Sequence, residues 1–464
     1  MLATSAGLEM IALFKSVPIL ATVHQLSFNF GVIKLDKSLR LVDAHHLKDY
    51  RTSKSVDSLI SELLDDMSKG AERFSRSKYQ VVFSNLLANL FYASSHGKAV
   101  LYDRNNNSRS KVMLNVIEYL ARKQFIDSNV QPANTKGNAS FVIAMPELIT
   151  LLNVHKIRVA HDSKEFKPLV LRGEKTKIGR KKIRGKELST LRLREHRKSE
   201  YKALTKATEL YNAYWESNAV TLNKKVVIPQ LHRVFNLNTD LGGRFYGAYQ
   251  ELSSKDRTSL LFNRKPTTEL DFSSLHIAML YAWKCVQMIG DPYTIKGYDR
   301  KVVKGIFLRL VNVNSISALQ AVITHSSKES TKEKYRQYID KRKVFELTAS
   351  KGLSAQAPVK PDWYDSFIKN VPTGFNSKQF IIDLMKRHSV IKDLLGGDNV
   401  GLRLQRADSE LMSNILVDLY DRKSPVPCLP VHDSLVCRKS NSELVRLTME
   451  HHFKVMFNTR ITVK

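Results

Sequence analysis

The chain contains little cysteine, and the little it has forms no pattern. Its 464 residues include only Cys285, Cys428 and Cys437, with no Cys-x-x-Cys pair and no spacing to histidine that is typical of a zinc site. This excludes a small fold held together by disulfide bonds. Because disulfides are rare inside cells, we expect a reduced, intracellular protein.

Long apolar runs and a phosphate-binding loop are missing as well. Glu9, Lys15 and His24 interrupt the apolar patches near the start, so no stretch approaches the roughly 20 apolar residues that span a membrane. No signal-peptide layout is evident. The sequence has no Gly-x-x-x-x-Gly-Lys motif, which argues against an ATP-driven motor. We therefore expect no membrane partner.

Acidic residues are scarce relative to basic ones. The sequence holds 74 Lys and Arg against 44 Asp and Glu, a formal net charge of +30. Because neutralising phosphates releases counterions, this surplus favours a nucleic-acid partner over a merely solvated basic surface. The length allows roughly two to four domains with a sizeable core.

The first part of the chain shows two regions of different pattern. Residues 1–78 mix apolar and polar stretches and indicate no role. Residues 79–160 contain two runs with helical periodicity, followed by a strand-like segment at 140–144. This is the order of a winged helix that docks in a DNA groove, although an ordinary small helical subdomain explains it equally well.

Residues 161–228 are predicted to be a basic linker with a helical end. Blocks of like charge are usually solvated, but this block lies between two structured regions, so DNA contact is a reasonable expectation. The residues concerned are Arg180, Lys181, Lys182 and Arg184. The pattern from 187 to 215 predicts one long charged helix. Residues 229–464 are predicted to be one mixed α/β unit.

An aspartate ends a strand-like segment in this last unit. Residues 267–270 follow Pro266 and lead to Asp271, and a helical pattern begins near Leu275. A carboxylate on a rigid strand end is suited to holding a metal ion. Capping of the following helix explains the same residue equally well.

A second aspartate has a more specific setting. Val431 and Leu435 flank His432, Asp433 and Ser434, which predicts an apolar hairpin with His-Asp at its bend. Gly or Asn is usual at such a bend, and an acidic group in an apolar setting is costly unless a cation or partner compensates it. Two such carboxylates, brought together by the fold, can hold two magnesium ions.

Two cations lie between the aspartate segments. Arg300 and Lys304 are four positions apart, so they share one face of a helix that continues through Phe307. Cations so placed can hold a triphosphate and assist the departure of pyrophosphate. A solvated basic face produces the same pattern.

In this order, the segments resemble the palm and fingers of family A DNA polymerases, the group of bacterial DNA polymerase I, over residues 231–464. Residues 239–247, with Arg244, look like that family's Thr-Gly-Arg motif. The other similar positions are Asp271 and Phe272 of its Asp-Tyr-Ser motif, Arg300 and Lys304 of its fingers helix, its template-contacting glutamine at Gln405, and His432 and Asp433 of its His-Asp-Glu motif.

The resemblance implies an α/β (α+β) fold, with an antiparallel palm sheet and helical fingers after a mostly helical, winged-helix-like region and a thumb-like 161–228. It implies two Mg²⁺ ions, for which Mn²⁺ can substitute, held by Asp271, Phe272 and Asp433. Lys304 would be catalytic. Further contacts with the nucleotide would come from Arg300, Phe307 and His276, and contacts with DNA from Arg244, Gln405 and His432.

Three departures from that family are visible. Ser434 replaces the glutamate of His-Asp-Glu, and His-Asp-Ser is the form in the related single-subunit RNA polymerases of phages and mitochondria. His276 occupies the position of the steric-gate glutamate, where the RNA polymerases have glycine. The aromatic positions of the fingers helix are Leu308 and Asn312 here.

We therefore predict a DNA-directed DNA polymerase of phage or mobile-element type without an exonuclease domain. Its partners would be primer–template DNA and nucleoside triphosphates, and its location cytoplasmic or nucleoid-associated. One alternative is a single-subunit RNA polymerase or primase, which Ser434 supports. Another is a non-catalytic replication initiator or DNA-binding regulator, which the divergent fingers helix supports.

Overall fold

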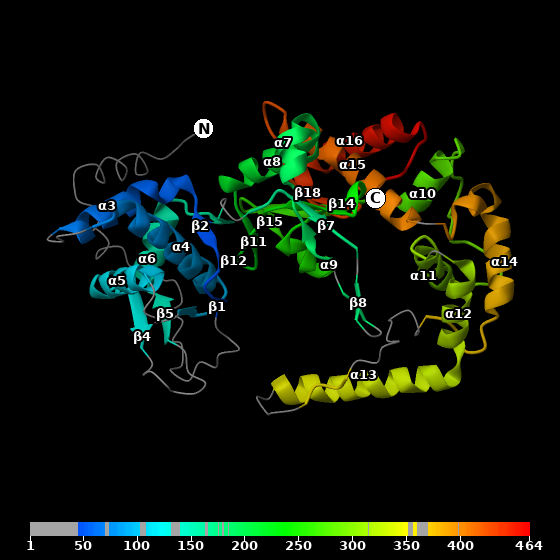
Figure 1. Ribbon diagram of the computed structural model, residues 1–464, viewed down its shortest axis with the longest axis horizontal. Coiled ribbons are helices and arrows are strands. Elements are labelled where there is room, and N and C mark those ends of the chain that lie inside the picture. The colour runs from blue at the N-terminus through cyan, green and yellow to red at the C-terminus, as the bar shows by residue number, and fades with distance from the viewer. Residues whose placement is uncertain are drawn as a thin grey trace. The chain divides into compact units, whose positions relative to one another are not determined.

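The computed structural model describes most of the chain after its first 44 residues. The described ranges are 45–69, 74–102, 108–130, 140–162, 166–174, 176–178, 181–183, 185–313, 315–350, 356–359, 370–397 and 399–464. The chain divides into two compact units (Figure 1). The first comprises Met1–Lys167, Asn212–Gln230 and Gly247–Thr267, and the second Pro168–Tyr211, Leu231–Tyr246 and Thr268–Lys464.

The first unit has a helical core. Its helices are α3 (Asp57–Ser68), α4 (Arg76–Ser95), α5 (Ser108–Arg122), α6 (Pro146–Val154) and the short α9 (Ser254–Arg257). Apolar residues at helical spacing on α3, α4 and α5 point to one another and form a buried cluster that includes Leu63, Phe83, Leu86 and Leu120.

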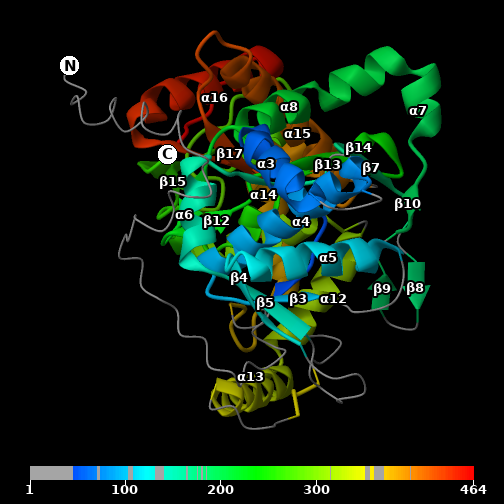
Figure 2. The ribbon, with the colours of Figure 1, turned by 90° about the vertical axis from the view of Figure 1, so that its left-hand side faces the viewer.

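A four-stranded sheet accompanies these helices, in the order β1 (His45–His46), β3 (Val100–Tyr102), β5 (Ser140–Ala144) and β4 (Ile126–Asn129). Strands β4 and β5 form an antiparallel pair, and α5 lies against β4 (Figure 2). The two predicted helices and the strand at 140–144 are confirmed, with β3 as an additional strand between the helices. Their docking on DNA stays a prediction.

Shorter elements complete the first unit. They are β2 (Tyr50–Thr52), β6 (Val159–His161), β11 (Val220–Leu222), β12 (Lys225–Val227), β15 (Leu261–Phe262), and the 3₁₀ turns η3 (Lys54–Val56) and η4 (Ala248–Glu251). No described helix in either unit combines the length and the apolar character that a membrane span requires.

The second unit begins with strands where a linker was expected. They are β7 (Leu169–Arg172), β8 (Thr176–Ile178), β9 (Lys181–Ile183) and β10 (Glu187–Leu188). Strands β8 and β9 form a hairpin, and β7 pairs with both β10 and β13 (His232–Asn236). The linker prediction is therefore wrong for β7 and β10, because both are strands of a sheet.

The predicted single helix over 187–215 is also wrong. The structure has β10, then α7 (Leu191–His196) and α8 (Lys198–Glu216). Arg197 separates the helices with φ −125° and ψ 49°, and its side chain pairs with Glu200 at 2.5 Å in the first turn of α8. An acidic residue at that place favours the start of a new helix.

Two sheets and one long helix position the residues of interest. One sheet has the order β10, β7, β13 and β14 (Asn238–Tyr246), and α15 (Val400–Tyr420) packs on β14. In the other, β16 (Lys265–Asp271) neighbours β18 (Ser434–Arg438), which pairs with β17 (Cys428–Val431). The turn η7 (Lys439–Asn441) and helix α16 (Ser442–Phe457) follow β18.

The rest of the second unit is helical (Figure 1). It contains α10 (Leu275–Ala282), α11 (Arg300–Leu310), α12 (Ile316–Ser327), the long α13 (Glu329–Ser350), α14 (Ser377–Arg387) and η6 (Ser389–Leu394). The molecule is thus a mixed α/β protein with mainly antiparallel sheets, as the sequence predicts.

Candidate active site at the paired aspartates

Asp271 is the last residue of strand β16, as predicted. Its backbone N–H and C=O both pair with the backbone of Lys464, each at 2.9 Å. The cap of α10 is Ser274, in a left-handed conformation with φ 59°, so the interpretation of Asp271 as a helix cap is wrong. The ring of Phe272 is buried next to Phe453, which leaves only the backbone carbonyl of Phe272 as a ligand group.

Asp433 occupies the bend of the predicted hairpin. Val431 pairs with Ser434 across the two strands, so His432 and Asp433 form a two-residue turn. His432 has φ 57°, a backbone conformation that glycine or asparagine adopts more easily. The flanking residues Leu429 and Leu435 are fully buried, which confirms the apolar setting.

The fold brings the two aspartates together. The backbone N–H of Phe272 donates to the backbone carbonyl of Asp433 at 3.4 Å, so the ends of β16 and of the hairpin lie side by side. Partial burial of the carboxyl group and, after it, the negative charge of Asp433 together raise the pKa of Asp271 to about 6. Lys304 opposes this shift, so its ammonium group is also near.

Glu269 is a third carboxylate at this place, and the sequence reasoning missed its role. The Ser434 hydroxyl donates to Oε1 of Glu269 at 2.6 Å and is also 3.1 Å from the carbonyl of Val431. Glu269 also raises the pKa of Asp271. Residues i and i+2 of a strand share one face, which is the signal that could have found it.

The predicted cations lie around a tyrosine that the sequence reasoning did not single out. Arg300 donates to both carboxylate oxygens of Asp291, at 2.6 and 3.1 Å. The Tyr293 ring lies 5.2 Å from the Arg300 guanidinium and 5.8 Å from the Lys304 ammonium. Arg300 and Lys304 therefore do share one face, as predicted. Tyr293 precedes the helix by several residues, where no periodicity marks it.

Phe307 does not face this surface. Its ring is fully buried and packs on Tyr293 at 6.4 Å and on His388 at 5.0 Å. The prediction that Phe307 contacts a nucleotide is therefore wrong in this structure. Phe307 belongs to the buried side of an amphipathic helix, whereas its neighbour Leu308 is exposed.

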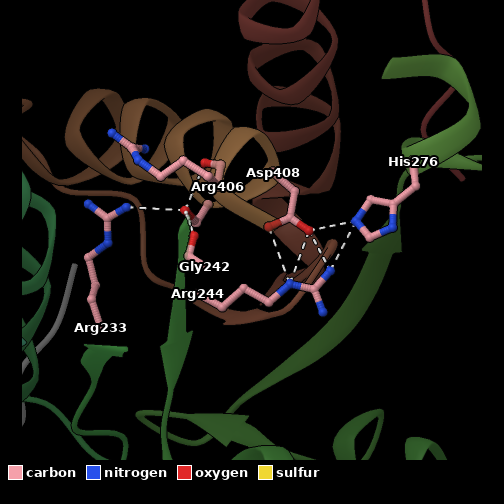
Figure 3. Close-up of polar contacts among 7 residues, drawn as sticks. Arg233, Gly242, Arg244, His276, Arg406 and Asp408 are labelled. Atoms are coloured by element: carbon pink, nitrogen blue, oxygen red, sulfur yellow. Dashed lines mark hydrogen bonds and ion pairs between the residues drawn. The ribbon is translucent and has the colours of Figure 1, made fainter. Parts of the chain in front are cut away.

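Arg244 and His276 meet at a buried carboxylate that the sequence reasoning missed (Figure 3). Asp408 on α15 accepts hydrogen bonds from Nε and Nη2 of Arg244, and its Oδ2 lies 2.8 Å from Nε2 of His276. Burial by itself lowers the pKa of Arg244, but the negative charges of Asp408 and then Asp433 outweigh it, so the pKa is raised. No signal in the sequence distinguishes Asp408 from other polar residues of an amphipathic helix.

The remaining predicted residues have separate surroundings. Gln405 is partly exposed on α15, and His432 is exposed with its ring 6.0 Å from that of Tyr246. Lys181 and Lys182 form part of β9. Arg180 and Arg184 lie outside the described residues.

The donor set at the aspartates suits a hard divalent cation. Two carboxylates and a backbone carbonyl are the oxygen ligands that Mg²⁺ prefers, and the mutual repulsion that raises the pKa of Asp271 is what a cation would relieve. Within the described ranges, no group of three or more His, Cys, Asp or Glu side chains is arranged to hold a metal ion. A site here would thus rely on two carboxylates and on backbone oxygen.

No protein-family model matches the chain, and no curated protein matches it.

Proposed function

We propose that the chain is a template-directed nucleotidyltransferase, a DNA polymerase that adds deoxynucleotides to a primer 3′ hydroxyl. The observation that carries this proposal is the meeting of Asp271 and Asp433, which come from distant parts of the sequence and lie side by side at two strand ends. Two carboxylates with a lysine nearby are the groups that nucleotidyl transfer requires.

The proposal assigns a chemical role to Asp271, Phe272, Asp433, Lys304 and Arg300. Asp271, Asp433 and the carbonyl of Phe272 would hold two magnesium ions, which when bound activate the primer hydroxyl and neutralise the leaving pyrophosphate. Lys304, exposed on α11 and close enough to influence the pKa of Asp271, would place its charge beside the departing phosphates. Arg300 would bind the triphosphate from the same face and would have to share its donors with Asp291.

The proposal is tested by primer extension with purified protein, magnesium and dNTPs. Asp271→Asn and Asp433→Asn should each lower the extension rate at least about a hundredfold, the scale of losing transition-state charge stabilisation. Both should bind primer–template DNA nearly as well as the wild type. Asp340→Asn, an exposed carboxylate on α13, is the matched control and should retain extension.

The outcomes separate the alternatives. Extension with NTPs rather than dNTPs would favour an RNA polymerase or primase, which Ser434 supports. Tight DNA binding by a wild-type protein that extends no primer with either substrate would leave the non-catalytic initiator or regulator. Normal extension by either aspartate variant would refute the assigned site.

A further inference from the structure

Asp408 is the most deeply buried of the three residues that meet at the contact between Arg244, His276 and Asp408. Its side chain is 1% exposed, while those of Arg244 and His276 are 18% and 19% exposed. Removing one partner from a buried ion pair is costly because the remaining charge is left uncompensated. Asp408 therefore holds two partly exposed side chains from a position that solvent hardly reaches.

One oxygen atom of Asp408 serves both partners. Oδ2 accepts from Nη2 of Arg244 and lies 2.8 Å from Nε2 of His276, and these two nitrogens are 3.1 Å apart. Arginine has only donors, whereas Nε2 of a neutral histidine is either a donor or an acceptor, depending on the tautomer. Because Oδ2 is shared by Arg244 and His276, the position of Arg244 constrains the orientation of the His276 ring.

The cluster adjoins the paired aspartates. Arg244 is near enough to Asp433 to respond to its charge, and His276 lies in the first turn of α10, just after the strand that ends at Asp271. Arg244 lies on β14 and His276 on α10, and Asp408 on α15 contacts both side chains. Among the described residues, Nη1 of Arg244 makes no hydrogen bond, and Figure 3 shows it directed away from Asp408.

We propose that Asp408 is a positioning residue that couples binding of the nucleic-acid duplex at Arg244 to binding of the incoming nucleotide at His276. The proposal rests on the polymerase function proposed above. When a phosphate of the duplex binds at Nη1 of Arg244, the other guanidinium nitrogens stay fixed against Asp408, and the fixed carboxylate holds the His276 ring in one orientation. Duplex binding thereby prepares the nucleotide site.

The coupling is measured with a double-mutant cycle on single-nucleotide incorporation. The variants are Arg244→Ala, His276→Ala and the double variant, and the readouts are the apparent nucleotide Kd and the maximal rate. Arg244→Ala should weaken nucleotide binding about five- to tenfold, which is at the low end of the usual range for coupled sites. Adding it to His276→Ala should change the nucleotide Kd by less than about twofold, because the histidine that transmits the effect is gone.

Arg406 supplies the matched control. It is also an arginine at the β14–α15 contact, but its Nε donates to the carbonyl of Thr239 at 3.0 Å and its Nη1 pairs with Glu410 at 2.9 Å. Figure 3 shows its side chain directed away from the cluster. Arg406→Ala and His276→Ala should therefore have additive effects on nucleotide Kd.

Asp408→Asn tests the coupling residue itself, because asparagine keeps the shape and removes the charge. It should raise the nucleotide Kd and weaken the affinity for primer–template DNA. The DNA affinity is measured by fluorescence anisotropy without divalent metal. In this background, Arg244→Ala should no longer affect the nucleotide Kd. If Asp408→Asn does not fold, the Arg244–His276 cycle tests the proposal on its own.

Two results would overturn the proposal, and they are distinguishable. A wild-type protein that incorporates no nucleotide refutes the polymerase function and the coupling with it. A wild-type protein that incorporates nucleotides, with additive effects of Arg244→Ala and His276→Ala, refutes the coupling alone and leaves the polymerase function in place.

Discussion

At the scale of single residues, Asp271 is held in an unfavourable electrostatic environment. Partial burial and the nearby carboxylates of Asp433 and Glu269 raise its pKa to about 6, against the opposing effect of Lys304. A carboxyl group whose pKa is raised on folding stabilises the folded state at pH values below its unfolded pKa, and this contribution is lost as the pH rises through the folded pKa. Ionised Asp271 therefore lowers the stability of the metal-free protein at neutral pH.

Asp271→Asn should consequently stabilise the metal-free protein near neutral pH. Although its carboxyl group is partly buried, the residue as a whole is exposed. We therefore discount the shift for solvent screening and expect a gain of about 1 kcal/mol at about pH 7.5. The gain should vanish near pH 4, where the wild-type carboxyl group is protonated in the folded state. The measurement is hydrogen exchange of the β16 and β18 amides at both pH values.

The control for this prediction is Asp340→Asn on the exposed face of α13. A surface substitution of this kind should change protection of β16 and β18 by less than about 0.5 kcal/mol at either pH. Lower protection in Asp271→Asn at neutral pH would contradict the electrostatic account.

At the scale of elements, the contact between β14 and α15 positions Arg244 opposite Asp408. Gly243 makes this contact close, because a Cβ atom there would lie 2.7 Å from Cε1 of Phe235 and 2.8 Å from Oγ of Ser409. Arg233 is buried in the same contact and donates to the carbonyls of Gly243 and Leu204 at 2.9 and 3.0 Å. A larger residue at 243 would separate the strand from the helix.

Gly243→Ala should therefore be more destabilising than an alanine at a comparable glycine. Gly243 has φ +85°, and Gly290 has φ +69° with no atom within 4 Å of the place that a Cβ would occupy, so Gly290→Ala carries the backbone strain alone. Overpacking should add about 1–3 kcal/mol at Gly243. In thermal melting, Gly243→Ala should unfold at least about 2 °C below Gly290→Ala. Equal melting temperatures would show that β14 and α15 tolerate separation.

At the scale of the whole molecule, the charge of +30 predicts strong dependence of nucleic-acid binding on salt. Each phosphate contact releases counterions, so the slope of log affinity against log salt reports the number of contacts. The β8–β9 hairpin lies in the most basic stretch of the sequence.

Replacing Arg180, Lys181, Lys182 and Arg184 with alanine should reduce that slope by about two to four units if the hairpin contacts DNA. The measurement is a salt titration of duplex binding by fluorescence anisotropy. The control removes equal charge from the exposed face of α13, at Lys334, Lys341, Arg342 and Lys343. The same slope in the hairpin variant and the wild type would show that the hairpin does not bind DNA.

The sequence alone determined the features that depend on local pattern. The apolar alternation around His432 and Asp433 specified a hairpin with these residues at its bend, and the spacing of Arg300 and Lys304 specified a shared helical face. Both are properties of neighbouring residues, so one chain segment is enough to show them. The helix break at Arg197 was missed because charge pairing overrode the periodic pattern. The burial of Phe307 follows the apolar face of its own helix, and the resemblance led us to expect a nucleotide contact instead.

Only the tertiary structure decided which distant side chains meet. Asp271 and Asp433 are joined through pairing at the ends of β16 and of the β17–β18 hairpin, and Glu269 reaches Ser434 through the adjacency of β16 and β18. Asp408 became a partner of Arg244 and His276 because α15 packs on β14 next to α10. Such contacts depend on how separate elements pack and not on the residues beside them in sequence, so no local pattern encodes them.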